Sequence, residues 1–223
     1  MKISEINIPK QIYILTGFTT LLCVGRVMLF GSTAHLYLLW NIFLAFLPFL
    51  ISSVLVWHID HKKVSLIGIC ITGIFWFLLF PNAPYLVTDL VHLGESFVVP
   101  IWYDSLLLFS CSVVGMTLAS HSLFHIEHLL KERYSRHHVR SMLAFLLLFS
   151  SFGIYIGRFL RFNSWDVFTD NVNFFKNIWR VLSGSSHFPE AYEFTALFFI
   201  FLWVFYIAWK HSKEEHLSRK DLR

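Results

Sequence analysis

Charged residues are scarce in this sequence. Asp, Glu, Lys and Arg make up 14% of its 223 residues, whereas soluble domains usually carry roughly 25%. Hydrophobic residues make up 56%, and phenylalanine alone contributes 25. So few charges do not cover a soluble surface, which excludes an ordinary cytosolic enzyme and a disordered tail. They also argue against a nucleic-acid partner, although the sequence pI is about 9.0. We expect one integral membrane domain, residues 1–223, whose main partner is the lipid bilayer.

Cysteines and enzyme signatures are also sparse. Cys23, Cys70 and Cys111 are set in apolar runs, without the spacing of a metal motif. They are expected to pack as small apolar residues rather than form disulfides. The sequence contains no Gly-x-Ser-x-Gly elbow, P-loop or Gly-x-Gly-x-x-Gly fingerprint. Whether the protein is an enzyme therefore stays open, and no cofactor is indicated.

Long apolar runs are what the sequence has in abundance. A helix needs about 20 mostly apolar residues to cross the hydrocarbon core of a bilayer. Six runs meet this condition, at about 12–30, 36–57, 64–80, 101–125, 141–157 and 191–209. The short alternating segments of a membrane barrel are absent. The sequence therefore predicts an all-α, polytopic transmembrane bundle.

Lysines and arginines indicate how the chain crosses the membrane. Most of the 18 lie in segments that six spans place on one side, together with both termini. By the positive-inside rule, the N- and C-termini are predicted to be cytoplasmic, in a cell membrane, with residues 210–223 as a charged tail. The connection 158–190 is the exception, because its four basic residues fall outside. These are Arg158, Arg161, Lys176 and Arg180.

Two loops on the predicted outer side contain short helices. In 81–100, Pro81 stops the third span, Asn82 and Pro84 suit a helix start, and Gly94 suits a stop. A helix over about 84–93 is too short to span and is predicted to be re-entrant or interfacial. In 158–190 an apolar stripe predicts an amphipathic helix lying in the interface. The stripe consists of Val172, Phe175, Trp179 and Leu182.

Polar side chains from five segments are predicted to lie at one depth on the outer side. Ionisable residues near membrane helices are costly and usually face the bundle interior or a wet cavity. Candidates for acid/base chemistry or cation binding are Asp89, His92 and Asp104. Candidates for ligand binding are Arg26, Asn41, Arg158, Arg161, Asn163 and Asp166. The charges nearly balance, so a structural ion-pair network and merely solvated loops are the alternatives.

Three histidines form a second cluster at the predicted cytoplasmic end of the fourth span. His121, His125 and His128 share one helix face, and three such side chains can bind a transition metal. The alternative is packing at the interface, with the apolar part of each ring buried. Their spacing does not match the His-Glu-x-x-His motif. They are therefore weak candidates for metal ligands.

Several short polar motifs within this apolar chain resemble those of a known family. They are Phe80-Pro81-Asn82-Ala83-Pro84-Tyr85-Leu86-Val87-Thr88-Asp89-Leu90, Gly157 to Asp166, Asn41 to Pro48, and Trp102-Tyr103-Asp104. The family is an uncharacterised group of predicted bacterial multi-pass membrane proteins, a domain of unknown function. The resemblance runs over roughly 25–210. It implies an integral membrane protein, and it implies no activity, substrate or partner.

Three functions remain open from the sequence. The first is an outer polar pocket that binds an anionic lipid or envelope-related ligand. The second is a non-catalytic accessory or scaffold subunit, whose partner is another membrane protein. The third is a small transporter, although spans three and six are almost devoid of ionisable residues at mid-depth.

Overall fold

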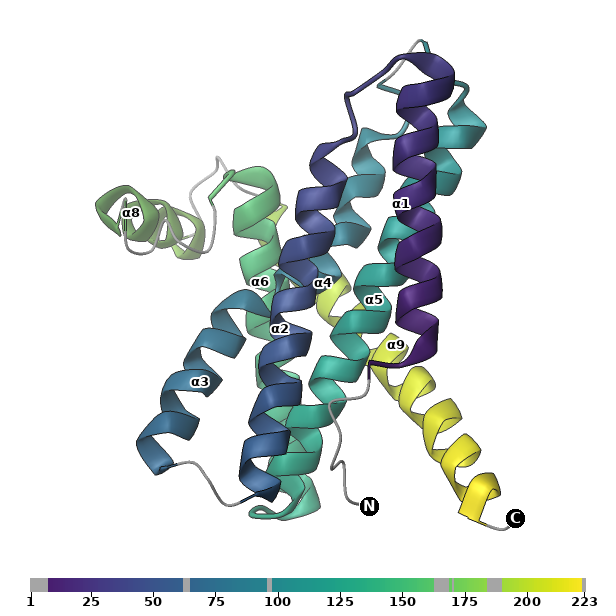
Figure 1. Cartoon of the computed structure of the whole chain (residues 1–223). Coiled ribbons are helices and arrows are strands. Elements are labelled where there is room, and N and C mark those ends of the chain that lie inside the picture. The colour runs from purple at the N-terminus through teal and green to yellow at the C-terminus, as the bar shows by residue number, and fades with distance from the viewer. Residues whose placement is uncertain are drawn as a thin grey trace. The chain divides into compact units, whose positions relative to one another are not determined.

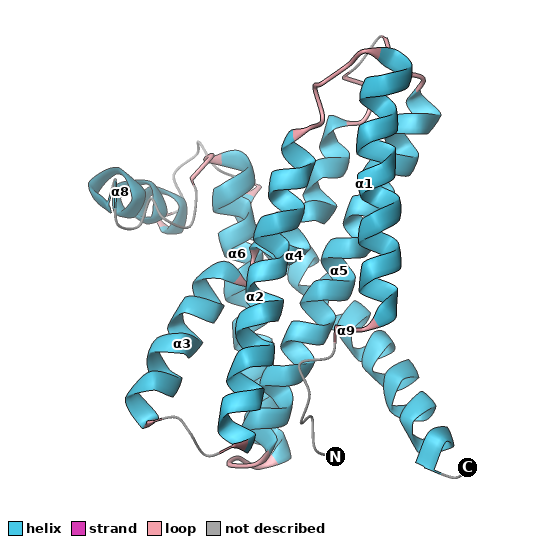
Figure 2. Cartoon of the chain, in the orientation of Figure 1, coloured by secondary structure: helices cyan, strands magenta, loops and turns pink. Residues whose placement is uncertain are grey.

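The computed structural model describes residues 8–61, 65–95, 98–162, 169, 171–183 and 190–221. The chain divides into two compact units, Met1–Glu132 and Arg133–Arg223. We call them unit 1 and unit 2 and describe each by itself. Every described element is a helix (Figure 2).

Unit 1 is a bundle of long helices with one broken segment (Figure 1). Its elements are α1 (Lys10–Phe30), α2 (Tyr37–Asp60), α3 (Leu66–Leu79), α4 (Asn82–Tyr85), the 3-10 helix η1 (Leu86–His92) and α5 (Ile101–Lys131). The helix α5 lies at the centre and packs against α1, α2, α4 and η1. Small residues such as Ser112, Gly115 and Ala119 line its buried surface. Such residues let neighbouring helix backbones approach closely where no hydrophobic effect drives association.

The segment from α3 to η1 forms one interrupted span, Ile67–His92. Pro81 follows α3, and the helix resumes as four α-helical residues and then a 3-10 turn. Polar side chains bond the backbone carbonyls around the break, as required where water is scarce. Thr88 donates to the Tyr85 carbonyl (2.7 Å) and Ser112 of α5 donates to the Leu86 carbonyl (3.3 Å).

Two sequence predictions can be compared with the structure at this break. The short helix predicted over 84–93 exists, but it covers 82–92 and most of it is 3-10. Gly94 follows with a left-handed φ of 87°, as its predicted role as a stop requires. The new helix starts at Asn82, but the Asn82 side chain does not cap it. Its amide instead donates backwards to the Leu79 carbonyl (3.0 Å), because the preceding helix ends with carbonyls that need donors.

Gly115 allows the broken segment to lie directly on α5. A Cβ atom added there would come within 2.3 Å of the Ala83 carbonyl oxygen and 3.0 Å of the Leu86 side chain. Real Cβ atoms do not approach a backbone oxygen so closely. The absence of a side chain at Gly115 therefore fixes how near α4 and η1 come to the central helix.

Unit 2 consists of α6 (Arg136–Phe159), α8 (Asn171–Leu182) and α9 (Ala191–Asp221). The helices α6 and α9 pack against each other, with Arg140 over the ring of Trp203 (5.8 Å). Tyr155, Val181 and Ala191 form a small core where the three helices meet, and Tyr192 donates to the Val181 carbonyl (3.1 Å). These contacts hold the C-terminal end of α8 at one end of the α6–α9 hairpin.

Candidate functional site

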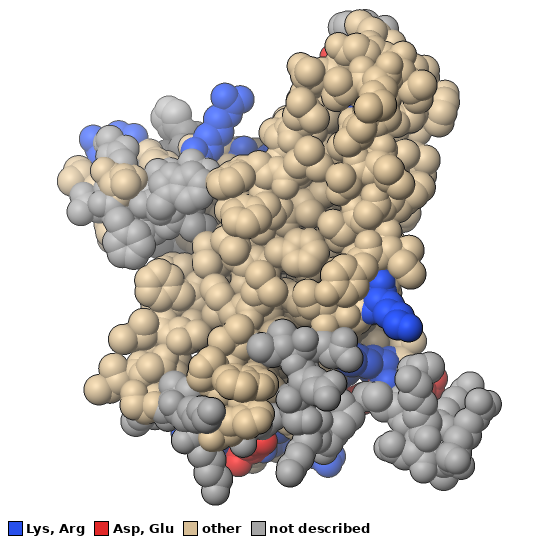
Figure 3. Space-filling view, viewed as in Figure 1, with Lys and Arg blue, Asp and Glu red and all other residues tan. Residues whose placement is uncertain are grey.

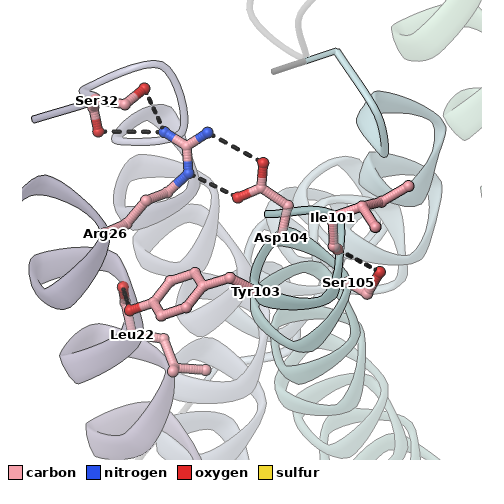
Figure 4. Close-up of polar contacts among 7 residues, drawn as sticks. All are labelled: Leu22, Arg26, Ser32, Ile101, Tyr103, Asp104 and Ser105. Atoms are coloured by element: carbon pink, nitrogen blue, oxygen red, sulfur yellow. Dashed lines mark hydrogen bonds and ion pairs between the residues drawn. The ribbon is translucent and has the colours of Figure 1, made fainter. Parts of the chain in front are cut away.

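Arg26 and Asp104 form a buried ion pair at one end of unit 1 (Figure 4). Nε of Arg26 donates to Oδ1 of Asp104 (2.7 Å), and Nη2 donates to Oδ2 (3.1 Å). The two side chains are 1% and 2% exposed. The remaining Nη1 donates to the backbone oxygen (3.2 Å) and the hydroxyl (2.8 Å) of Ser32. All three nitrogens of the guanidinium therefore have acceptors from the chain itself.

The local backbone explains why these groups meet. Gly31 ends α1 in a left-handed conformation (φ 66°), and its N–H bonds the Val27 carbonyl (2.9 Å). This turn returns Ser32 to Arg26. The cation lies near the C-terminus of α1 and Asp104 in the first turn of α5, which is the favourable orientation for both helix dipoles. We use the name Arg26 end for this region, which also includes residues 31–36, the first turns of α2, and η1.

Tyr103 strengthens the same contact between α1 and α5. Its hydroxyl donates to the Leu22 carbonyl (2.9 Å), and its ring meets Phe30 edge-on, with centroids 5.2 Å apart (Figure 4 shows the hydroxyl contact). Gly25 makes room for it, because a Cβ there would lie 2.7 Å from the Tyr103 hydroxyl. Neither Tyr103 nor Gly25 was among the sequence candidates, since nothing in the sequence shows that these two residues pack against each other.

The other unit 1 candidates also have partners at the Arg26 end. Asn41 of α2 donates from Nδ2 to Oδ2 of Asp89 (3.1 Å), and Asp89 is buried on η1. His92 and Glu95 pair at the surface (2.8 Å). The three candidates for acid/base chemistry thus lie at one end of the unit, with Asp104 bonded to Arg26, Asp89 to Asn41, and His92 to Glu95.

His35 is a functional candidate that the sequence reasoning missed. Its imidazole is buried, with 4% of the residue exposed, and neither ring nitrogen has a hydrogen-bond partner among the described residues. Its ring lies beside Tyr37 (centroids 5.8 Å apart), which in turn meets His92 edge-on (5.8 Å). A single histidine in a short loop gives no periodicity or motif that predicts burial.

Unit 2 contains the remaining ligand-binding candidates. Arg158 lies in the last turn of α6, and Arg161 follows the helix with its side chain exposed. Arg161 has φ 58°, a left-handed conformation that residues other than glycine adopt at a cost. Asn163 and Asp166 lie outside the described residues.

The helix α8 has the amphipathic character that the sequence predicted. Val172, Phe175 and Trp179 are all exposed, Trp179 to 72%, while the Leu182 side chain lies outside the described part. Lys176 and Arg180 are exposed on the same helix, and basic atoms gather over α8 in Figure 3. We call α8 together with Arg158 and Arg161 the α8 end of unit 2.

The three histidines of α5 each have their own contact within unit 1. Nε2 of His121 lies 2.7 Å from Nε2 of Gln11, and Nδ1 of His125 lies 3.1 Å from the Ser52 hydroxyl. His128 lies 3.8 Å from Glu132. Among the described residues, no group of three or more His, Cys, Asp or Glu side chains is arranged to hold a metal ion.

A buried hydrogen-bond chain connects His125 with α3. Nε1 of Trp76 donates to the Ser122 hydroxyl (2.8 Å), which lies 3.1 Å from the Ser52 hydroxyl. The Ser52 hydroxyl lies 2.9 Å from the Phe49 carbonyl oxygen and 3.1 Å from Nδ1 of His125. The chain satisfies an indole N–H within the bundle and joins α2, α3 and α5. Serines in apolar runs gave no sequence signal for it.

The helices define the class of the protein. Six of them are long and apolar enough to cross a membrane, with large side chains such as Met28 (80% exposed) on their outer faces. In Figure 3 uncharged residues cover most of the visible face over α1 and α2. This is a multi-pass membrane protein in contact with lipid.

The comparison with protein families agrees with the resemblance seen in the sequence. Residues 40–206 match the family described as "Protein of unknown function (DUF1361)", and the chain belongs to that family. No curated protein and no solved structure matches the chain. The family carries no assigned activity, so any function rests on the geometry of the two ends described above.

Proposed function

We propose that this membrane protein binds an anionic lipid head group, or an envelope precursor with similar phosphate chemistry, at the α8 end of unit 2. Arg158 and Arg161 hold the anion in this proposal. They are three residues apart at the end of α6, and a guanidinium matches a phosphate with two parallel hydrogen bonds. The observation that carries the proposal is the left-handed backbone of Arg161, φ 58°.

The conformation of Arg161 favours a functional role over chance. A residue other than glycine loses about 1 kcal/mol in this conformation, and such residues concentrate at ligand clamps and switches. The side chain is exposed at a helix end, so packing of the guanidinium does not explain the cost. A site that presents this guanidinium to an anion would explain why the chain bears the cost of this backbone conformation.

The surface of α8 suits the same ligand. An exposed tryptophan and phenylalanine beside exposed basic groups are typical of helices that lie among lipid head groups. Lys176 and Arg180 add positive charge to the connection that carries Arg158 and Arg161. A basic, aromatic surface of this kind attracts anionic head groups.

The role that we propose for the Arg26 end is structural. The Arg26 guanidinium is already bonded to Asp104 and Ser32, and Asp89 to Asn41. A ligand would have to displace a bidentate carboxylate that is 2% exposed. We therefore propose that this network fastens α1, α2 and η1 to α5.

We further propose that the α8 end is extracytoplasmic and that both termini are cytoplasmic, in the cell membrane. The support is the excess of Lys and Arg in the segments on the opposite side of the spans. Reporter fusions after residues 61, 95 and 183 test the orientation. Activity of an extracytoplasmic reporter at 95 and 183, with none at 61, agrees with it, and the reverse pattern contradicts it.

Ligand binding is tested with the purified protein in detergent and short-chain phosphatidic acid as the probe. Arg161→Gln and Arg158→Gln should each weaken binding about 10-fold or more, because each removes a charge-assisted hydrogen bond worth roughly 1.5–3 kcal/mol. Lys210→Gln is the matched control, since it removes one positive charge at the opposite end of the α6–α9 hairpin. Binding should also weaken as the salt concentration rises from about 0.05 to about 0.5 M, because added salt screens the attraction between the arginines and the anion more strongly.

Two results would count against the proposal. Equal affinities of Arg161→Gln and Lys210→Gln would mean that the anion binds by overall charge and not at this site. Loss of folded protein in both arginine variants would assign them to structure instead. Co-purification of a stoichiometric membrane protein that is lost on Trp179→Ala would favour the accessory-subunit alternative, because the same exposed face would then contact a partner.

A further inference from the structure

His35 occupies an unusual place for an ionisable side chain. It lies in the short connection 31–36, between the candidate spans Lys10–Phe30 and Tyr37–Ile59, and it is buried. Both Nδ1 and Nε2 are enclosed and lack a hydrogen-bond partner. Among the described residues the other buried polar atoms without a partner are single threonine hydroxyls, on Thr16 and Thr195.

Charged groups from three elements face this imidazole. They are Arg26 of α1, Asp104 of α5, and the pair His92 and Glu95 at the end of η1. Asp104 is already bonded to Arg26 and Glu95 to His92. Tyr37 of α2 lies alongside the ring and presents its aromatic face rather than a charge. The two carboxylates that act electrostatically on His35 are thus already paired.

We propose that His35 is a proton-controlled latch on the connection 31–36, closed while the imidazole is neutral and buried, and released when it takes up a proton. A buried imidazolium without a partner is costly. It must either leave its enclosure, which opens the connection, or compete with Arg26 for Asp104 or with His92 for Glu95. Each outcome loosens the network at the Arg26 end. The ligand for this site is the proton, and the site is independent of the anion site proposed in unit 2.

The direction of the pH dependence follows from the surroundings. Burial lowers the pKa of His35 below its ordinary value of 6.5, and Arg26 lowers it further. Asp104 and Glu95 act in the opposite direction, and His92 lowers the pKa. The closed form therefore binds a proton more weakly than the open form. The stability of the closed form is complete above pH 6.5 and is lost as the pH falls below that value towards the lowered pKa.

Hydrogen exchange of the backbone amides of residues 31–36 tests the latch directly. Protection factors, corrected for the intrinsic exchange rate at each pH, are measured from pH 8 to pH 4.5 in the full-length protein. Opening takes up one proton, so the protection of the wild-type protein should fall by up to 10-fold per pH unit below 6.5. In His35→Phe, which keeps an aromatic ring but does not titrate, this pH-dependent fall should disappear. His58→Phe, at the opposite end of α2, is the matched control and should keep the wild-type profile.

A second measurement reads the protonation of His35 in the wild-type protein itself. The imidazole nitrogens of the wild-type protein, labelled with ¹⁵N-histidine, report the protonation of His35 by nuclear magnetic resonance, and His35→Gln assigns its signals. A neutral ring at pH 7 that protonates below pH 6.5 agrees with the latch. An imidazolium at pH 7 would overturn the proposal. The same pH dependence of amide protection in His35→Phe and in the wild type would overturn it as well.

Discussion

The Arg26 end of unit 1 and the α8 end of unit 2 both gather ionisable residues next to apolar helices, but they treat charge in opposite ways. At the Arg26 end the guanidinium and its carboxylate are almost completely buried and bonded to each other. At the α8 end Arg161, Lys176 and Arg180 are exposed to the surroundings. A buried charge needs its partner within the chain, since desolvation is so costly. An exposed charge is able to meet a partner from outside.

The two ends also differ in how they use a left-handed residue. The connection after α1 turns at Gly31 (φ 66°), for which this conformation has no steric cost. The connection after α6 turns at Arg161 (φ 58°), for which it does. The first turn is therefore explained by folding alone. The second keeps a large cationic side chain at a place where glycine would be more stable, and the proposed anion site rests on this cost.

The largest expected effect is at the buried ion pair. Asp104→Leu leaves the Arg26 guanidinium buried without its carboxylate, which should lower the free energy of unfolding by roughly 3–5 kcal/mol. Thermal unfolding of the purified protein in detergent measures it. Arg26→Met combined with Asp104→Leu removes both charges and should recover most of the loss. A double variant as unstable as the single one would mean that the pair's hydrogen bonds, rather than the unpaired charge, dominate.

A smaller effect is expected where the broken span lies on α5. Gly115→Ala drives a methyl group against the Ala83 carbonyl, and overpacking of this kind usually lowers the free energy of unfolding by about 1–3 kcal/mol. Gly17→Ala is the matched control, because a Cβ there has nothing within 4 Å. It should be neutral or stabilise α1 by up to about 1 kcal/mol. Similar unfolding temperatures for the two variants would show that α4 and η1 are not held as closely as described.

The smallest effect sharpens the contrast between the two turns. Arg161→Gly removes the left-handed strain and should raise the free energy of unfolding by up to about 1 kcal/mol, while binding of short-chain phosphatidic acid falls. Arg158→Gly, inside α6, should instead lower the free energy of unfolding by about 1 kcal/mol, because glycine disfavours helices. Opposite signs in the two unfolding measurements support the strain at Arg161. A loss of stability in both variants would mean that the backbone strain at Arg161 no longer supports a functional role.

Much of the architecture was predictable from the sequence because lipid imposes simple conditions on the chain. Long apolar runs have to be helices, so the six spans were found. Pro81 and Gly94 correctly marked the two ends of the short helical segment formed by α4 and η1. The helix ends were less accurate. The helices α5 and α9 extend to Lys131 and Asp221, well past the predicted spans, because polarity ends a membrane crossing but does not end a helix.

The candidate site was predictable by depth but not by partner. Placing Arg26, Asn41, Asp89 and Asp104 at one level required only the span boundaries. Pairing Arg26 with Asp104 requires α1 to lie beside α5, and this depends on small residues such as Gly25, whose effect on packing is not visible in the sequence. For His35 there was no signal, because its burial depends on the turn at Gly31 and on the packing of η1. The residues assigned to ligand binding remain predictions.

The ion pair between Arg26 and Asp104 has a consequence for how the chain is made. The two residues are 78 positions apart, and at a usual synthesis rate of roughly 5–20 residues per second, Asp104 follows Arg26 by about 4–16 s. During that time α1 has to keep its guanidinium among head groups or against the insertion machinery. The first helix therefore enters the membrane before its counter-charge exists, and it is locked in place only when the central helix arrives.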